Sequence, residues 1–495
     1  MLRIRRSRAA RPACWASGWL ALSSIMIADV ARAADPAAAP PPPTPPQQAL
    51  VLQPIVGLQE TYTDNAALTT TDKVSDLITR VMLSLQATLD TGRAEGHLNA
   101  NAGYDVYARD TYLSGWYAAG NGDASYALVP GLLTLKAGAS TSDGTISTFG
   151  VSATDRHGAP NLVQQTTYDV GPELTGRTPD GLDVKAAARF AQVIYSNVSS
   201  RPLSVPRDDS IGQLTEVIST DASRRLQLEN SGEYLHDTQD FMSVSDVQSA
   251  FIRVGEFRLI GRVGYDDINQ STVLHISAPL GSVGFEYQPN STSTITVETG
   301  SRYNRPAWAA KATVELSPRL LATATYVEEV EPDQVGVARS YFTFTDAARD
   351  LPPLLVPTSF GVSPNVANTT SFSRSASLRG VYHDETNSLA VTADWIDREY
   401  LTIPGGDRTL LVDANFTRQM RPDLTLVLRA DYAHTLDSAF YGPSQTAGGS
   451  VQLAYRLNSR TDVTCSYARV QNRQFVPGGE RVTENALTLT LRRTL

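Results

Sequence analysis

The amino-acid sequence predicts an all-β fold: a transmembrane, antiparallel, up-and-down β-barrel of about 22 strands, within a range of 18–22. Three observations predict it. Segments of roughly ten residues alternate apolar and polar side chains, aromatic residues end many of the apolar rows, and short turns alternate with longer connections. No segment after about residue 50 keeps the apolar spacing of an amphipathic helix. Because lipid cannot hydrogen-bond an open sheet edge, membrane-crossing strands must close into a barrel.

The N-terminal residues 1–33 have the order of a secretory signal peptide. Arginines start the chain, an apolar stretch follows over residues 13–27, and Ala31 and Ala33 provide the small residues of a cleavage site. The apolar stretch is shorter than the ~20 residues that a membrane-spanning helix needs. We therefore expect cleavage before Ala34. Residues 34–49 are rich in proline, which predicts a semi-rigid periplasmic linker before a barrel at residues 50–495.

Charge, cysteine content and linker length exclude several classes of protein. Residues 1–33 carry six arginines and one aspartate, so their removal lowers Lys+Arg from 42 to 36 and Asp+Glu from 51 to 50, a net charge of −14. An acidic chain is unsuited to nucleic acid. Only Cys465 follows the expected cleavage site, so no intramolecular disulfide is expected. The linker is also too short for the N-terminal plug of a ligand-gated TonB-dependent transporter.

The alternation is clearest over residues 424–434, where Leu424, Leu426 and Leu428 alternate with residues such as Thr425 and Arg429. A soluble β-sandwich alternates too, so the aromatic residues help to decide. They end apolar rows near the loop side, as in the girdle of an outer-membrane barrel: Tyr104, Tyr234, Tyr265, Tyr287, Tyr303, Tyr326, Tyr382, Trp395, Tyr432 and Tyr467.

The connections predict the strand count. We expect short turns at residues 91–94, 129–131, 178–182, 220–224, 254–257, 288–292, 317–319, 384–387, 421–423 and 458–461, with an opening strand near 50–62 and a closing strand near 484–495. Longer polar connections are expected at residues 142–162, 197–209, 333–372, 435–447 and 471–481.

The long external loop predicted at residues 331–373 contains apolar side chains such as Phe342 and Leu354. Loops of this length are usually functional or disordered. We expect this one to constrict the barrel mouth, so that deletion of residues 335–368 raises single-channel conductance. An unchanged conductance would contradict this expectation.

The final strand places Leu487, Leu489 and Leu491 on one face, as expected of a terminal strand that the barrel assembly machinery binds. The chain ends in Leu495 where such strands usually end in an aromatic residue. Arg493 falls on the lipid-facing row, where a position near the interface costs only about 0–1 kcal/mol.

The polar row of the strands predicts a charged lumen of both signs. Its candidate lining residues are Arg80, Lys136, Arg189, Glu286, Glu298, Lys311, Glu315, Arg379, Asp394, Asp413, Arg429 and Asp431. These charges could cross-brace a wide barrel, set the selectivity of a polar path, or do both. No pair of His or Cys residues has metal spacing, and no nucleophile or phosphate-binding motif occurs. We therefore predict no catalytic residue, no metal and no cofactor, and a protein that is not an enzyme.

One phrase near the start resembles a known family. The run Gly57 to Leu68 contains Glu60, Tyr62, Thr63, Asp64 and Asn65, and is similar to the first strand of a β-barrel porin family of proteobacteria. Many members occur with exopolysaccharide or exosortase systems. The resemblance implies an outer-membrane barrel and a link to polysaccharide or its export proteins, and it supplies no catalytic residues. From chemistry alone, Thr63-Asp64-Asn65 suits a turn, and a ligand or calcium contact is the alternative.

The function expected is a porin-like channel in the cell outer membrane for polar solutes, with exopolysaccharide export as its more specific form. A non-conducting barrel that scaffolds an envelope export complex is the alternative, and it predicts no conductance. An outer-membrane hydrolase is the third, and it predicts Ser, His and Asp converging at one rim. The expected partners are outer-membrane lipid and the barrel assembly machinery, with no nucleic acid, and the expected oligomeric state is a monomer.

Overall fold

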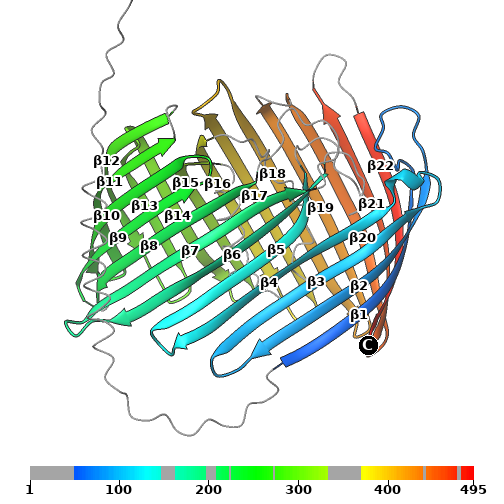
Figure 1. Cartoon of the computed structure of the whole chain (residues 1–495), viewed down its shortest axis with the longest axis horizontal. Coiled ribbons are helices and arrows are strands. Elements are labelled where there is room, and N and C mark those ends of the chain that lie inside the picture. Colours follow the sequence, from blue (N-terminus) through cyan, green and yellow to red (C-terminus); the bar gives the residue numbers. More distant parts are fainter. Residues whose placement is uncertain are drawn as a thin grey trace, which may run out of the picture.

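The computed structural model describes residues 50–145, 162–196, 208–221, 224–270, 274–332, 370–438, 442–475 and 481–495. They form one 22-stranded sheet that closes into a barrel, because β1 pairs with β2 on one side and with β22 on the other (Figure 1). The predicted fold class is thus confirmed. The expected signal peptide (1–33) and linker (34–49) lie outside the described residues.

Every strand runs antiparallel to the next strand in the chain. The strands are β1 (Leu50–Thr63), β2 (Asp76–Asp90), β3 (Ala94–Tyr107), β4 (Gly115–Val129), β5 (Leu133–Thr145), β6 (Leu162–Arg177), β7 (Leu182–Ser196), β8 (Asp209–Thr220), β9 (Leu226–Asp237), β10 (Phe241–Val254), β11 (Phe257–Gln270), β12 (Leu274–Tyr287), β13 (Thr294–Arg302), β14 (Arg305–Ser317), β15 (Leu320–Pro332), β16 (Thr370–His383), β17 (Asn387–Tyr400), β18 (Gly406–Arg421), β19 (Leu424–Ser438), β20 (Ser444–Asn458), β21 (Thr461–Gln474) and β22 (Arg481–Thr494). A 3-10 helix, η1 (Thr111–Leu113), lies between β3 and β4.

All ten predicted short turns fall on the connections that follow β2, β4 and each further even-numbered strand up to β20. They lie at one end of the barrel, together with the start of β1 and the C-terminus (Figure 1). The turn after β6 shows the chemistry: Gly181 has φ +81°, which a glycine adopts without steric cost, and Thr178 Oγ1 accepts the Leu182 amide at 3.0 Å. Breaker residues therefore located these turns correctly.

The connections at the opposite end, called the loop end below, differ from the prediction. The strands extend into each predicted long connection; β15 reaches Pro332 and β16 begins at Thr370, so the ends of the predicted 331–373 loop are strand. Residues 333–369 lie outside the described residues. Another loop-end connection is tight: β13 joins β14 through Tyr303 and Asn304 alone, both with positive φ (56° and 60°). Two such residues form a hairpin turn without the Gly or Pro that would mark it in the sequence.

The outward row of each strand is apolar and exposed. Leu83 is 58% exposed and Val263 and Val283 are each 65% exposed, whereas the residues between them belong to the inner row. The predicted girdle needs correction at three positions. Tyr287 and Tyr382 lie beside short turns, so they belong to the opposite girdle, and Tyr303 is 8% exposed in its hairpin turn. Among the described residues, the structure contains no helix that is both long and apolar enough to cross a membrane.

Candidate functional site

The inner row of the barrel carries the charged residues singled out in the sequence. Each of the twelve lies on its strand between outward positions: Arg80 is on β2; Lys136 on β5; Arg189 on β7; Glu286 on β12; Glu298 on β13; Lys311 and Glu315 on β14; Arg379 on β16; Asp394 on β17; Asp413 on β18; and Arg429 and Asp431 on β19. Exposed apolar neighbours such as Val81 and Leu378 fix the orientation of this row, because successive side chains point to opposite faces.

Arg80 and Asp105 form a buried pair on the inner face. They lie directly opposite each other on β2 and β3, and the guanidinium donates to both carboxylate oxygens, at 2.5 and 2.8 Å. The side chains are 7% and 0% exposed, and the Arg80 guanidinium stacks 3.9 Å from the centre of the Tyr117 ring on β4. The pair ties three successive strands together along the wall.

Two arginines bridge from one strand to the next but one. Arg262 of β11 donates to Glu298 of β13 at 2.8 Å, and Arg302 of β13 donates to Asp266 of β11 at 3.0 Å. Both cross β12, where small residues leave room: Ala278, opposite Asp266, is fully buried. The long side chains therefore lie along the wall and brace it. On the same part of the wall Glu286 lies 3.5 Å from Arg258.

Basic residues gather on the inner face of β5 to β7. Lys136 lies 2.9 Å from Glu173 of β6, and Lys185 of β7 lies 3.8 Å from the same carboxylate. Arg189 follows on the same row of β7. Three cations thus lie around Glu173 in this region, and Asp169 of β6 lies opposite Ala191 on the same inner row.

Acidic residues gather on the inner face of β17 to β19. Asp413 of β18 and Asp431 of β19 lie directly opposite each other, and Asp394 of β17 lies opposite Leu411, two residues before Asp413. On β20 the position beside Asp431 is Gly448, and a Cβ there would collide with the Asp431 carboxylate. Like charges directly across a sheet are destabilising, so this row is unfavourable for the fold by itself.

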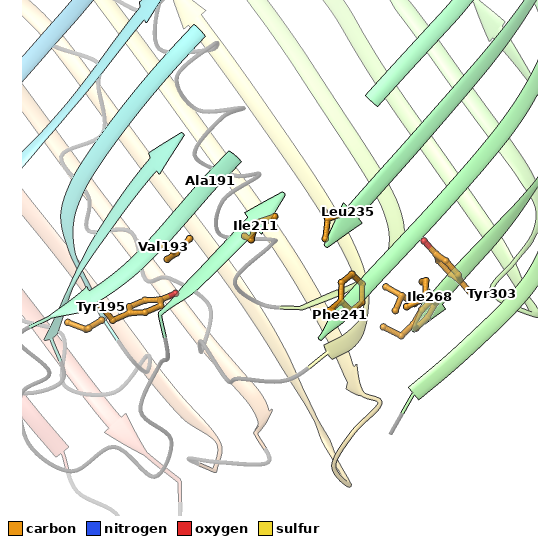
Figure 2. Packing of buried hydrophobic residues seen from close by; sticks show 11 residues of the cluster. Ala191, Val193, Tyr195, Ile211, Leu235, Phe241, Ile268 and Tyr303 are labelled. Carbon is orange, nitrogen blue, oxygen red and sulfur yellow. The ribbon is translucent and has the colours of Figure 1, made fainter. Parts of the chain in front are cut away.

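The inner row turns apolar toward the loop end, although the sequence pattern predicted a charged lumen. Val193, Ile211, Leu235, Phe241 and Ile268 are 0–4% exposed and belong to one cluster that follows β7 to β11 (Figure 2). The sequence of β7 contains a sign of this apolar cluster, since Ala191, Val193 and Tyr195 continue the row of Arg189. The lumen is therefore not polar along its whole length.

The residues that resemble the porin family, Glu60 to Asn65, lie at the seam, where β1 pairs with β22 and closes the barrel. Thr63 of β1 donates from Oγ1 to Glu484 Oε1 of β22 at 2.7 Å. Asp64 accepts from the backbone and side-chain amides of Asn485 at 2.7 and 2.6 Å. Asn65, fully buried, donates from Nδ2 to the carbonyl oxygen of Thr483 at 3.1 Å.

The same residues also form the turn that was predicted from Thr63-Asp64-Asn65. Asn65 Oδ1 accepts from the Thr69 amide at 3.0 Å, and Asn65 Nδ2 donates to the Thr69 carbonyl at 2.8 Å. Tyr62 is half exposed on the outward row, and Glu60 accepts from Thr79 Oγ1 at 2.9 Å. These residues were predicted from the sequence, but their hydrogen bonds between the first and last strands, β1 and β22, were not.

The described residues show little sign of the other chemistries considered. They include no group of three or more His, Cys, Asp or Glu placed to hold a metal ion. His236 contacts the Phe241 carbonyl at 3.1 Å and His434 contacts the Tyr432 hydroxyl at 3.3 Å, whereas His97 lies 3.8 Å from Asp123 and His275 lies 3.9 Å from Asp267. His157 lies outside the described residues.

Comparisons with known proteins give structural likeness alone. No family model matches the sequence, and no curated protein matches it. The fold is similar to the FrpB iron transporter (F5-1 variant) from Neisseria meningitidis, with 12% identity, a TM-score of 0.47, and coverage of 90% of this chain and 82% of that one. It is also similar to the siderophore receptor PirA from Acinetobacter baumannii, with 9% identity, a TM-score of 0.48, and coverage of 90% and 80%.

A third similar structure is the ferripyoverdine receptor of the outer membrane of Pseudomonas aeruginosa, with 11% identity, a TM-score of 0.49, and coverage of 90% of this chain and 72% of that one. These likenesses concern the barrel fold, and no functional residue is carried over from them.

Proposed function

We propose that the protein is an outer-membrane channel for polar solutes. The observation that carries the proposal is the opposite chemistry of the two barrel faces: exposed apolar residues outside, and paired or clustered charges on the inner row. An apolar outer band suits lipid, and a polar inner face suits water. Arg262 and Arg302, which bridge β11 and β13, lie along the wall.

The two charged regions give the channel a transverse asymmetry. The basic region on β5 to β7 and the acidic region on β17 to β19 lie on well-separated parts of the closed sheet. Opposed charges of this kind orient dipolar and hydroxyl-rich solutes in a water-filled lumen. A neutral polysaccharide chain, which the sequence resemblance suggests, is therefore the solute class we propose for this channel.

Single-channel recording tests the proposal. The mature protein, residues 34–495, is refolded and inserted into planar bilayers, where we expect discrete ohmic steps on the order of a nanosiemens for a barrel of this strand number. Addition of oligosaccharides of increasing length then measures which sizes enter the lumen. A folded, inserted barrel without conductance would contradict the channel and favour the scaffolding role. A conducting barrel that no oligosaccharide enters would support the channel and contradict polysaccharide as its solute.

A further inference from the structure

Four basic side chains cluster on the outer surface of the barrel at the loop end of β21 and β22. We call Lys73, Arg469, Arg473 and Arg481 the outer basic patch; all four are exposed. Arg469 and Arg473 share the outward row of β21 with exposed Tyr467, and Arg481 shares the outward row of β22 with exposed Leu487. The patch therefore faces away from the lumen.

The depth of the patch follows from its neighbours. Tyr467 and Leu487 lie directly opposite each other and are 46% and 52% exposed, and Leu489 and Leu491 continue the apolar row below them. Arg469 lies two residues beyond Tyr467, about 5 Å further along the membrane normal for a tilted strand. In a bilayer, this is the layer of the lipid headgroups.

The cations are held close together. Arg473 and Arg481 lie directly opposite each other on β21 and β22, an arrangement that like charges disfavour. Lys73 reaches the same strand, where its amine donates to the carbonyl oxygen of Thr483 at 3.0 Å. Arg473 is steadied by the Phe475 ring, 4.8 Å from its guanidinium carbon. The fold thus concentrates positive charge where repulsion opposes it.

Carboxylates of the protein do not neutralise the patch among the described residues. Arg481 donates to the neutral side chain of Gln471 at 2.7 Å. Asp64, the acid of the neighbouring β1–β2 connection, is engaged by the amides of Asn485 at 2.7 and 2.6 Å. Within the described part of the chain, the patch therefore keeps cationic donors that an external anion can bind.

We propose that the outer basic patch binds the phosphate group of an outer-leaflet lipid. A guanidinium presents a planar pair of donors that matches phosphate oxygens, and several arginines within one headgroup layer can share one phosphate. Basic residues at a membrane surface each add about 1 kcal/mol of attraction to anionic lipid. The inference rests on the proposed outer-membrane location, which places the loop end at the outer leaflet.

The test compares two lipids and two triple variants. Purified full-length protein in detergent is titrated with lipid A and with its dephosphorylated form, and bound lipid is measured by native mass spectrometry. We expect the triple variant R469Q/R473Q/R481Q to bind lipid A on the order of 100-fold more weakly than the unmodified protein. The control R319Q/R418Q/R460Q removes three exposed arginines from the short-turn end and should leave binding unchanged.

Two results would overturn the proposal: wild-type lipid A affinity in the R469Q/R473Q/R481Q variant, or equal binding of the two lipid forms by the unmodified protein. Heat-modifiable gel mobility checks that the variant barrel is folded; if it is not, the single variant R469Q takes its place. Single-channel conductance is measured on the same samples. If the barrel conducts but does not prefer lipid A to its dephosphorylated form, lipid binding by the patch is wrong and the proposed channel function still stands.

Discussion

At the scale of single residues, the wall is built from side chains whose charges are satisfied by neighbouring strands. Arg80 and Asp105 show this most clearly, because both are buried and their two hydrogen bonds are short. A charge that loses its partner inside a protein costs far more than the pair contributes. The pair is therefore sensitive to removal of one member alone.

We expect Asp105→Leu to lower the free energy of unfolding by about 3–5 kcal/mol. The double variant Arg80→Met/Asp105→Leu should be affected less, since it leaves no unpaired guanidinium in the wall. Urea unfolding of barrels in vesicles, followed by tryptophan fluorescence, measures both. If Asp105→Leu lowers the free energy of unfolding no more than the double variant does, the Arg80–Asp105 pair is not shielded from water in the way that its burial indicates.

The turn between β16 and β17 gives a prediction on pH. The carboxylate of Asp384 accepts hydrogen bonds from the Thr386 amide (2.9 Å) and from both amides of Asn387 (2.8 and 3.0 Å), and these bonds lower the pKa of Asp384 below its ordinary value of 3.8. The carboxylate form is therefore the stabilising one: its contribution is complete above the ordinary pKa and is lost as pH falls through the lowered value.

Asp384→Asn should accordingly destabilise the hairpin at neutral pH and have a shrinking effect as the solution is acidified below pH ~4. Hydrogen exchange of the Thr386 and Asn387 amides measures the effect locally. An effect that stays constant from pH 7 to strongly acidic conditions would mean that the charge of Asp384 does not support the turn.

At the scale of elements, the seam between β1 and β22 depends on side chains as well as on the strand ladder. Asn65→Ala removes one bond to Thr483 and two to the backbone of Thr69, and we expect a loss of about 1–3 kcal/mol in stability. The loss should appear as a lower temperature of the heat-modifiable gel shift.

Asn290→Ala is the matched control for the seam. Asn290 caps the β12–β13 turn through three bonds to Thr292 and Ser293, at a point away from β1 and β22. Its loss should loosen that turn and leave the gel-shift temperature near the wild-type value. Equal shifts for the two variants would show that Asn65 acts as an ordinary turn residue.

Turn chemistry decided how much of this architecture could be predicted. Proline and glycine mark the short turns, as in Pro179-Asp180-Gly181, and all ten were located. The tight β13–β14 hairpin carries no such mark, because Tyr303 and Asn304 adopt positive φ without glycine. The long predicted connections were too wide, since polar residues such as Ser444 and Thr446 of β20 continue the strands toward the loop end.

The sequence predicts which residues lie on the inner row, but only in part which of these residues contact one another. Alternation places Asp413 and Arg262 on one face, but it does not reveal which charges meet. Arg262 reaches Glu298 across an intervening strand because β12 offers small residues there, a fact of tertiary packing. The apolar loop-end cluster was missed because each of its strands contributes only one to three residues.

At the scale of the whole molecule, the separated charged regions predict ion selectivity. The triple variant Asp394→Asn/Asp413→Asn/Asp431→Asn should shift the reversal potential in a salt gradient toward anion preference. Lys136→Gln/Lys185→Gln/Arg189→Gln, which removes the same number of charges from the basic region, should shift it toward cation preference.

The two variants serve as controls for each other, because each changes the inner row by three charges and leaves the outward apolar row intact. Shifts of the same sign, or no shift in either, would mean that permeating ions do not pass these side chains. The channel proposal would then need another route through the barrel.

The seam also makes closure of the barrel depend on the last strand of the chain. Thr63 and Glu484 are 421 positions apart in the chain, and β22 is the last strand of the sequence. Until β22 arrives, one edge of β1 keeps its amide and carbonyl groups unpaired, and such an edge invites pairing with other chains. A chain that lacks residues 481–495 would leave this edge of β1 unpaired, so we expect that it cannot close into the barrel.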